Sequence, residues 1–189
     1  MFLISKIAFA VTYNSNPKIF ITELVDDAIK TLSDKSITKQ EKNKFIEEIA
    51  KANVDIKGIG LYTLGKIRKD LDEKTMSEYH ILFEKYFLKS LISRLTDYSD
   101  QKFNVIDSTQ KNAKYTIVHS KIEEGSAQPE IKIDWRVYTK NPQKPLIRDL
   151  IVEGLSLART QKEEFSSILN SNNGDVNVLF ESLRNFSNN

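Results

Sequence analysis

The spacing of apolar residues changes near the middle of the chain. Up to residue 99, apolar positions recur every three or four residues, the period of an α-helix. Asn16-Pro17 and the capping box that opens at Thr38 supply two helix starts, and Gly65 follows a third helical segment as a C-terminal cap. The pattern predicts helices that begin at these two caps, a short helix over 55–65 and a long one over 75–99.

Alternation of apolar and polar residues takes over after residue 100. Ile133, Trp135 and Val137 share one face of a predicted strand, and Asp134 and Arg136 share the other. Short links between such strands favour antiparallel pairing. The sequence therefore predicts four strands, over 103–106, 115–123, 131–138 and 146–153, followed by helices over 156–169 and 175–186, which is an α+β fold.

Composition narrows the class of protein. The 189 residues carry 28 Lys and Arg against 26 Asp and Glu, so neither a basic arm nor a nucleic-acid-binding surface is expected. Cysteine is absent, which excludes disulfides, thiolate catalysis and Cys-ligated metals. Residues 17–189 are expected to form a single domain with a sizeable hydrophobic core.

The first 16 residues have two open interpretations. The segment is apolar with a single lysine, Lys6, and is too short to span a membrane. Ala8-Phe9-Ala10 has the small-x-small pattern of a signal cleavage site, which favours the remnant of an export signal. The alternative is an N-terminal helix packed on the domain.

No catalytic or metal-binding constellation stands out. Gly154-Leu155-Ser156 resembles the start of a nucleophile elbow, but the last glycine of that motif is missing and no histidine follows, so Ser156 is predicted to cap a helix. The two histidines, His80 and His119, have no metal-ligand spacing and are expected to be structural. The sequence therefore predicts neither an enzyme nor a metalloprotein.

The apolar surface is the unusual feature. Apolar side chains occupy more of the circumference of helix 75–99 than a one-sided surface helix needs, so protein or ligand must cover most of it. A close-packed core and an apolar cavity both remain open as explanations. If a cavity exists, its expected lining is Phe83, Phe87, Leu91 and Leu95 from that helix with Ile117, Ile133, Trp135 and Val137 from the strands.

Several stretches together resemble the MlaC, or toluene-tolerance, family of periplasmic phospholipid-binding proteins. The strongest lies at the strand-to-helix joint, where DLIVEGLSL over 149–157 is followed by Phe165 and Ile168-Leu169. The similarity extends over about residues 20–186, with the predicted elements in the family's order. Its other parts are the segments 54–65, 94–99 and 103–105, together with Phe83.

This resemblance implies a fold, a ligand and partners. The fold would be similar to nuclear transport factor 2, with a curved four-stranded antiparallel sheet and several helices enclosing an apolar cavity. The protein would be a monomeric periplasmic carrier with no cofactor, holding a diacyl phospholipid. It would shuttle lipid between an outer-membrane lipoprotein–porin complex and an inner-membrane ABC transporter with an MCE-type component, maintaining outer-membrane lipid asymmetry.

The chain departs from the family pattern at three places. Gln161-Lys162 stands where an aromatic-Arg pair often follows the joint, and Ile67 stands in place of a common tryptophan. The export signal is short or incomplete. The first two departures bear on headgroup or partner contacts, and the third bears on the periplasmic location.

Two other functions compete with the carrier. An enzyme on the same scaffold, acting on a small apolar substrate, would need His119, Asp134 or Asp149 to converge inside the cavity, and strand alternation argues against Asp134. An adaptor would hold a partner helix in the apolar groove. No cluster of Arg or Lys is evident along the sequence, so weak discrimination between lipid headgroups is expected.

Overall fold

The computed structural model of the chain describes residues 13–95, 102–124 and 129–188. Within these ranges the elements follow the predicted order, with helices first, then an antiparallel sheet and two closing helices. They are α1 (Pro17–Ser33), α2 (Lys39–Asn53), α3 (Ile56–Thr63), the 3-10 helix η1 (Ile67–Lys69), α4 (Glu73–Leu95), β1 (Phe103–Asn112), β2 (Tyr115–Ile122), β3 (Ile131–Tyr138), β4 (Leu146–Val152), β5 (Leu155–Ser156), α5 (Leu157–Ser171) and α6 (Val176–Asn188).

The first two helices begin where the capping signals predict. The Asn16 side chain accepts hydrogen bonds from two early backbone amides of α1, and Pro17 occupies the first helical turn. Thr38 and Glu41 form the reciprocal capping box of α2. Both starts are therefore set by interactions within four residues, which sequence analysis can detect.

The predicted element limits need two corrections and one exclusion. The first strand continues to Asn112, well beyond the apolar segment 103–106, because backbone pairing with β2 supports its exposed polar half. A fifth strand, β5, pairs with the end of β4 after a turn in which Glu153 and Gly154 have positive φ. Residues 96–99 of the predicted long helix and residues 1–12 of the predicted export-signal remnant lie outside the described residues.

The sheet has the strand order β1-β2-β3-β4-β5, with every neighbouring pair antiparallel. Val118 lies opposite Trp135 in the register, so both side chains project from the same face, which packs against α1. His119 lies opposite Asp134, and this pair projects from the other face. Strand alternation therefore separates Val118 and Trp135, which face α1, from His119 and Asp134, which lie on the opposite face.

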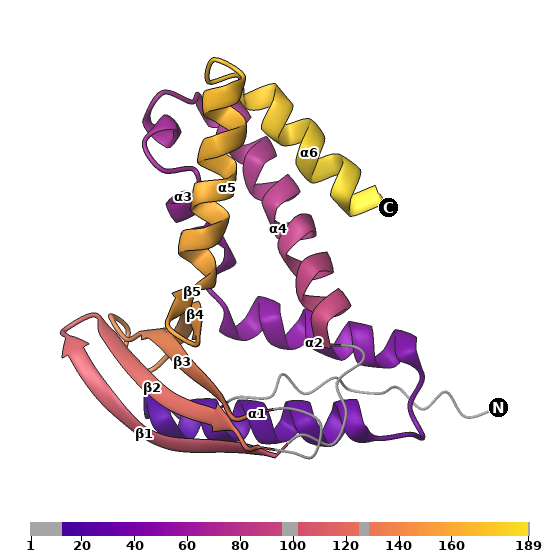
Figure 1. Cartoon of the computed structure of the whole chain (residues 1–189), viewed down its shortest axis with the longest axis vertical. Helices are drawn as coiled ribbons and strands as arrows, with labels where there is room; N and C mark the ends of the chain where they lie inside the picture. Colours follow the sequence, from indigo (N-terminus) through magenta and orange to yellow (C-terminus); the bar gives the residue numbers. More distant parts are fainter. Residues whose placement is uncertain (1–12, 96–101, 125–128, 189) are drawn as a thin grey trace.

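Two hydrophobic clusters hold the described part of the molecule together. One fills the helical arm, which we define as α3, α4, α5 and α6, and the other fills the sheet arm, which we define as α1 and the strands. Helix α2 lies between the arms (Figure 1). Val54, at the end of α2, packs against both clusters and forms a parallel β-bridge with Ile147. This short segment is therefore one place where the arms join; α5, which follows β5 directly, also packs against β4.

No helix in the described ranges is long and apolar enough to cross a membrane.

Candidate functional site

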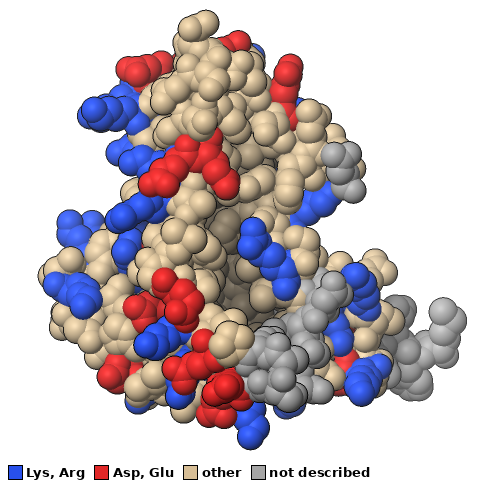
Figure 2. Space-filling model, viewed as in Figure 1, with Lys and Arg blue, Asp and Glu red and all other residues tan. Residues whose placement is uncertain are grey.

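A groove of about 810 Å³ crosses the face of the sheet that carries His119 and Asp134. Strands β1 to β4 form its floor, and α3, η1 and the start of α5 form its wall. We call this side of the sheet the groove face. In Figure 2, Lys and Arg side chains gather along the left-hand edge of the molecule, where the helical arm meets the sheet arm.

Positive charge dominates the groove. Arg68, Lys111, Arg136 and Arg148 line it, and Asp134 is the single carboxylate among its described lining residues. These cations come from η1, β1, β3 and β4, so their separation in sequence hides the cluster. No cluster of Arg or Lys is evident along the sequence, but the fold brings these four cations to one surface. The alternation in β3 was one signal that could have pointed to a charged surface, because it places Asp134 and Arg136 on one face of the sheet.

The floor and wall also carry apolar side chains. Ile59 and Leu61 come from α3, Ile117 and Ile151 come from β2 and β4, and Ala158 comes from the first turn of α5. Ile117 is buried despite lining the groove. The groove thus carries apolar and cationic side chains together on one concave surface, a combination that suits an amphiphilic anion.

Arg148 is held rigidly by groups on three elements. Its Nε donates to Asp55 Oδ2 at 2.6 Å, and its Nη1 donates to the Tyr115 hydroxyl at 2.8 Å. The guanidinium carbon lies 3.5 Å from the centroid of the Tyr138 ring. Burial by itself lowers the pKa of Arg148, but the hydrogen bonds to Tyr115 and Asp55 outweigh it and raise the pKa. The result is a fixed positive charge that links the two arms.

Asp149 anchors Arg136 and the start of α5. Its side chain is 1% exposed and lies 3.3 Å from Arg136 Nη1. It accepts hydrogen bonds from Ser156 Oγ at 2.6 Å and from the Ala158 amide at 3.0 Å. Ser156 Oγ in turn accepts from the Arg159 amide at 3.1 Å, which confirms the prediction that Ser156 is a helix cap.

His119 and Asp134 meet inside the groove. His119 Nδ1 lies 2.7 Å from Asp134 Oδ1, and its Nε2 lies 3.3 Å from Thr109 Oγ1. Alternation correctly separated Asp134 from the face of Trp135, but the groove lies on the Asp134 side, so the argument that excluded Asp134 from a cavity is wrong. Among the described residues, no group of three or more His, Asp or Glu side chains is placed to bind a metal.

The eight predicted cavity residues do not surround one space in this structure. Ile117 faces the groove, whereas Ile133, Trp135 and Val137 project from the opposite face, toward α1. Contact of these residues with lipid stays a prediction. On α4, Phe83 is fully buried in the helical arm, whereas Phe87, Leu91 and Leu95 are half-buried.

Comparisons with known proteins agree with this architecture. The model of the family described as MlaC protein matches residues 22–185. The chain is similar to the solved phospholipid-binding protein from Ralstonia solanacearum in complex with a phospholipid, with 17% sequence identity and a TM-score of 0.72. The similarity covers 88% of this chain and 94% of the Ralstonia chain. No curated protein matches the chain. Because the family match spans most of the sequence, the chain belongs to the MlaC protein family.

Proposed function

We propose that this protein is a carrier of diacyl phospholipids that works in the periplasm. Its partners in this proposal are an outer-membrane lipoprotein–porin complex and an inner-membrane ABC transporter with an MCE-type component. Membership of the MlaC family supports the proposal, and so does the likeness to a protein described in complex with a phospholipid. The structural observation that carries it is a groove whose lining combines apolar and cationic side chains.

The energetics explain why such a carrier needs a protected site. A two-chain lipid carries roughly 30 methylenes, and at about 0.8 kcal/mol each their exposure to water costs on the order of 20 kcal/mol. The groove floor supplies part of the required apolar surface. Ile59 and Leu61 of α3 and Ala158 of α5 add apolar surface on the wall, where acyl chains would gain further contacts.

Native mass spectrometry of the gently purified protein tests lipid binding. We expect an additional mass that corresponds to a diacyl phospholipid. Ile151→Glu places a carboxylate on the groove floor and is expected to reduce lipid retention at least tenfold. Ile106→Glu is the matched control because Ile106 is 49% exposed on β1, outside the groove lining. Folded protein with a clean apo mass would count strongly against the carrier.

A transfer experiment tests the shuttle. Labelled phospholipid is placed in donor vesicles, and its arrival in acceptor vesicles is followed with and without the protein. We expect faster transfer with wild type and Ile106→Glu than with Ile151→Glu. Equal rates for all three proteins would reject carriage of lipid through this groove.

The His119–Asp134 pair favours a second candidate function, an enzyme acting on a small apolar substrate. A carboxylate fixes the imidazole at 2.7 Å inside a groove, as a general base requires. His119→Gln separates the two candidates. A carrier should keep its bound phospholipid and its transfer rate after this change, whereas an enzyme should lose turnover.

A further inference from the structure

The cations of the groove differ in how far carboxylates neutralise them. Arg148 is paired with Asp55, and Arg136 is next to the buried Asp149. Arg68 has no carboxylate partner among the described residues. Its Nη1 donates to the carbonyl oxygens of Leu61 at 3.0 Å and Gly65 at 2.8 Å, which holds the guanidinium at the C-terminal end of α3.

Lys111 is the second cation without a carboxylate partner among the described residues. It is exposed on β1 and lines the groove. Near Lys111, at the start of the neighbouring strand β2, the Tyr115 hydroxyl accepts a hydrogen bond from Arg148, so its own proton is free to donate. Arg136 contacts Asp149 through one Nη atom, which leaves further N–H donors beside the groove.

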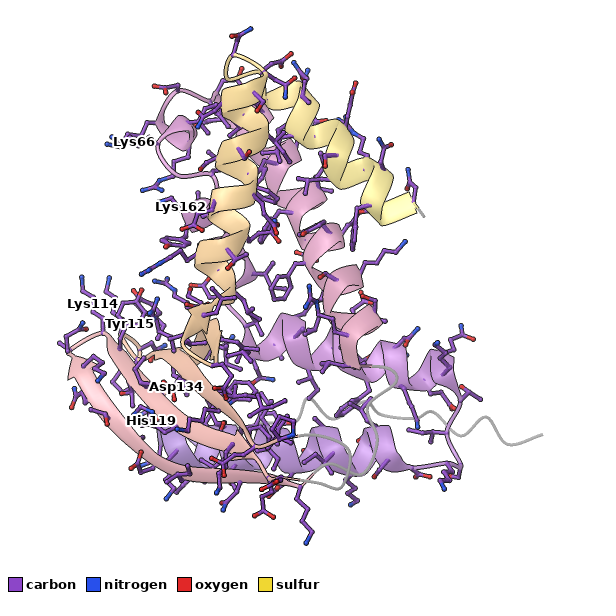
Figure 3. The ribbon with its side chains drawn as sticks, viewed as in Figure 1. Lys66, Lys114, Tyr115, His119, Asp134 and Lys162 are labelled. Atoms are coloured by element: carbon purple, nitrogen blue, oxygen red, sulfur yellow. The ribbon has the colours of Figure 1, made fainter. Side chains whose placement is uncertain are left out.

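These donors come from both arms and line the same concave surface. Figure 3 shows Tyr115, His119 and Asp134 on the sheet arm, at the left of the view. Lys66 and Lys162, which lie above them, are at the left of the view as well. The single lining carboxylate, Asp134, is already paired with His119. An anion in the groove would therefore meet two uncompensated cations and several N–H and O–H donors, and most of the negative charge nearby is already paired.

We propose that Arg68, Lys111 and Arg136, with the Tyr115 hydroxyl, form a subsite for a phosphate group. The proposal deepens the proposed function, on which it rests for the lipid ligand: the phosphodiester would lie among these cations, while acyl chains would follow the apolar side chains of the same groove. Arginine and lysine bind phosphate through charge-assisted hydrogen bonds. Phosphate is common to phosphatidylethanolamine and phosphatidylglycerol, so this subsite is compatible with weak discrimination between those two headgroups.

A charge-matched pair of double variants tests the subsite. Arg68→Gln with Lys111→Gln removes the two uncompensated cations. The control, Lys66→Gln with Lys114→Gln, removes two exposed lysines that do not line the groove. Lys66 is close in sequence to Arg68, and Lys114 is close in sequence to Lys111. Neither double variant breaks an ion pair between described residues, so both should fold, which circular dichroism checks.

The binding assay compares phosphatidylglycerol with diacylglycerol carrying the same acyl chains. Wild type and the Lys66/Lys114 variant should bind phosphatidylglycerol about tenfold or more tightly than diacylglycerol. The Arg68/Lys111 variant should lose most of that preference, and its affinity for diacylglycerol should not change. An equal preference in all three proteins would overturn the subsite while leaving lipid carriage intact.

Glycerol 3-phosphate, which has no acyl chains, separates a lipid headgroup from a free phosphate ligand. Weak binding to wild type that disappears in the Arg68/Lys111 variant supports the subsite independently of the tails. If wild type binds glycerol 3-phosphate but neither lipid, the proposed function fails and the subsite stands. If it binds the lipids without preference and shows no glycerol 3-phosphate binding, the subsite is rejected.

Discussion

The helical arm and the sheet arm bury their side chains in different ways. In the helical arm, Phe83 stacks on Tyr79 with centroids 5.6 Å apart and meets Phe165 edge-on at 6.2 Å. In the sheet arm, one face packs against α1 through residues such as Val118 and Val137, while the other face carries ions and a groove. One arm is packed from several sides, and the other is packed on a single side.

This difference shows where function can reside. A close-packed aromatic cluster leaves little space for a ligand and contributes mainly stability. A sheet face that is only partly covered leaves polar groups free to contact solvent or ligand. The four predictions below test this division, from the largest expected effect to the smallest.

The largest effect is expected from Phe83→Ala in the helical arm. Phe83 is 1% exposed and contacts four aromatic rings, so its truncation should lower the free energy of unfolding by about 3–5 kcal/mol. Phe103→Ala is the same change at a half-buried position of the sheet arm, where we expect about 1–2 kcal/mol. Urea denaturation measures both, and equal losses would contradict the difference between the arms.

Two changes on β3 sharpen the division within the sheet arm. Val137 is fully buried between the sheet and α1, so Val137→Trp should overpack the cluster and cost about 1–3 kcal/mol or more. Ile133 is half-buried, so in Ile133→Glu the carboxylate stays partly solvated and the protein should fold. Because the groove lies on the opposite face of the sheet, a loss of lipid in this variant would show that acyl chains also reach the α1 face. Circular dichroism melting and lipid extraction report on both variants. If both unfold, this face of the strand is close-packed core; if both fold and remain loaded, it does not line a lipid site.

Ser156→Ala tests the joint between β5 and α5. Loss of the helix cap should lower the free energy of unfolding by about 1 kcal/mol. The hydrogen bond to Asp149 is lost as well, although Asp149 keeps the Ala158 amide and Arg136. Lipid retention and transfer should not change. A variant of normal stability that loses all function would instead revive a chemical role for this hydroxyl.

The smallest effect is a pH dependence that arises in the helical arm. His80 Nδ1 is buried without a hydrogen-bond partner among the described residues, and burial, followed by the positive charge of Lys57, lowers the pKa of His80. Its folded-state pKa is then below the unfolded value of about 6.5, so the unfolded chain binds the proton more readily. Stability should therefore fall as the pH drops below about 6.5. His80→Gln should flatten the dependence in denaturation curves between about pH 7.5 and 5, and an unchanged slope would assign the effect to other groups.

Interactions between residues close in sequence were the most predictable part of the fold. The caps at Asn16, Thr38 and Ser156 act within three or four residues, and each forms as predicted. The alternation along β3 also gave the correct partition of its side chains between two faces. The polar half of β1 was missed because its strand structure depends on pairing with β2 rather than on its own apolar pattern.

The sequence by itself determined the kinds of elements, their order and the division of each strand into two faces, because backbone periodicity and caps are local properties. Only the tertiary structure decided which face of the sheet would be sealed by α1 and which would border a groove. It also brought Arg68, Lys111, Arg136 and Arg148 from four separate elements to one surface. Alternation fixes which side chains point the same way, but packing of distant helices fixes what those side chains face.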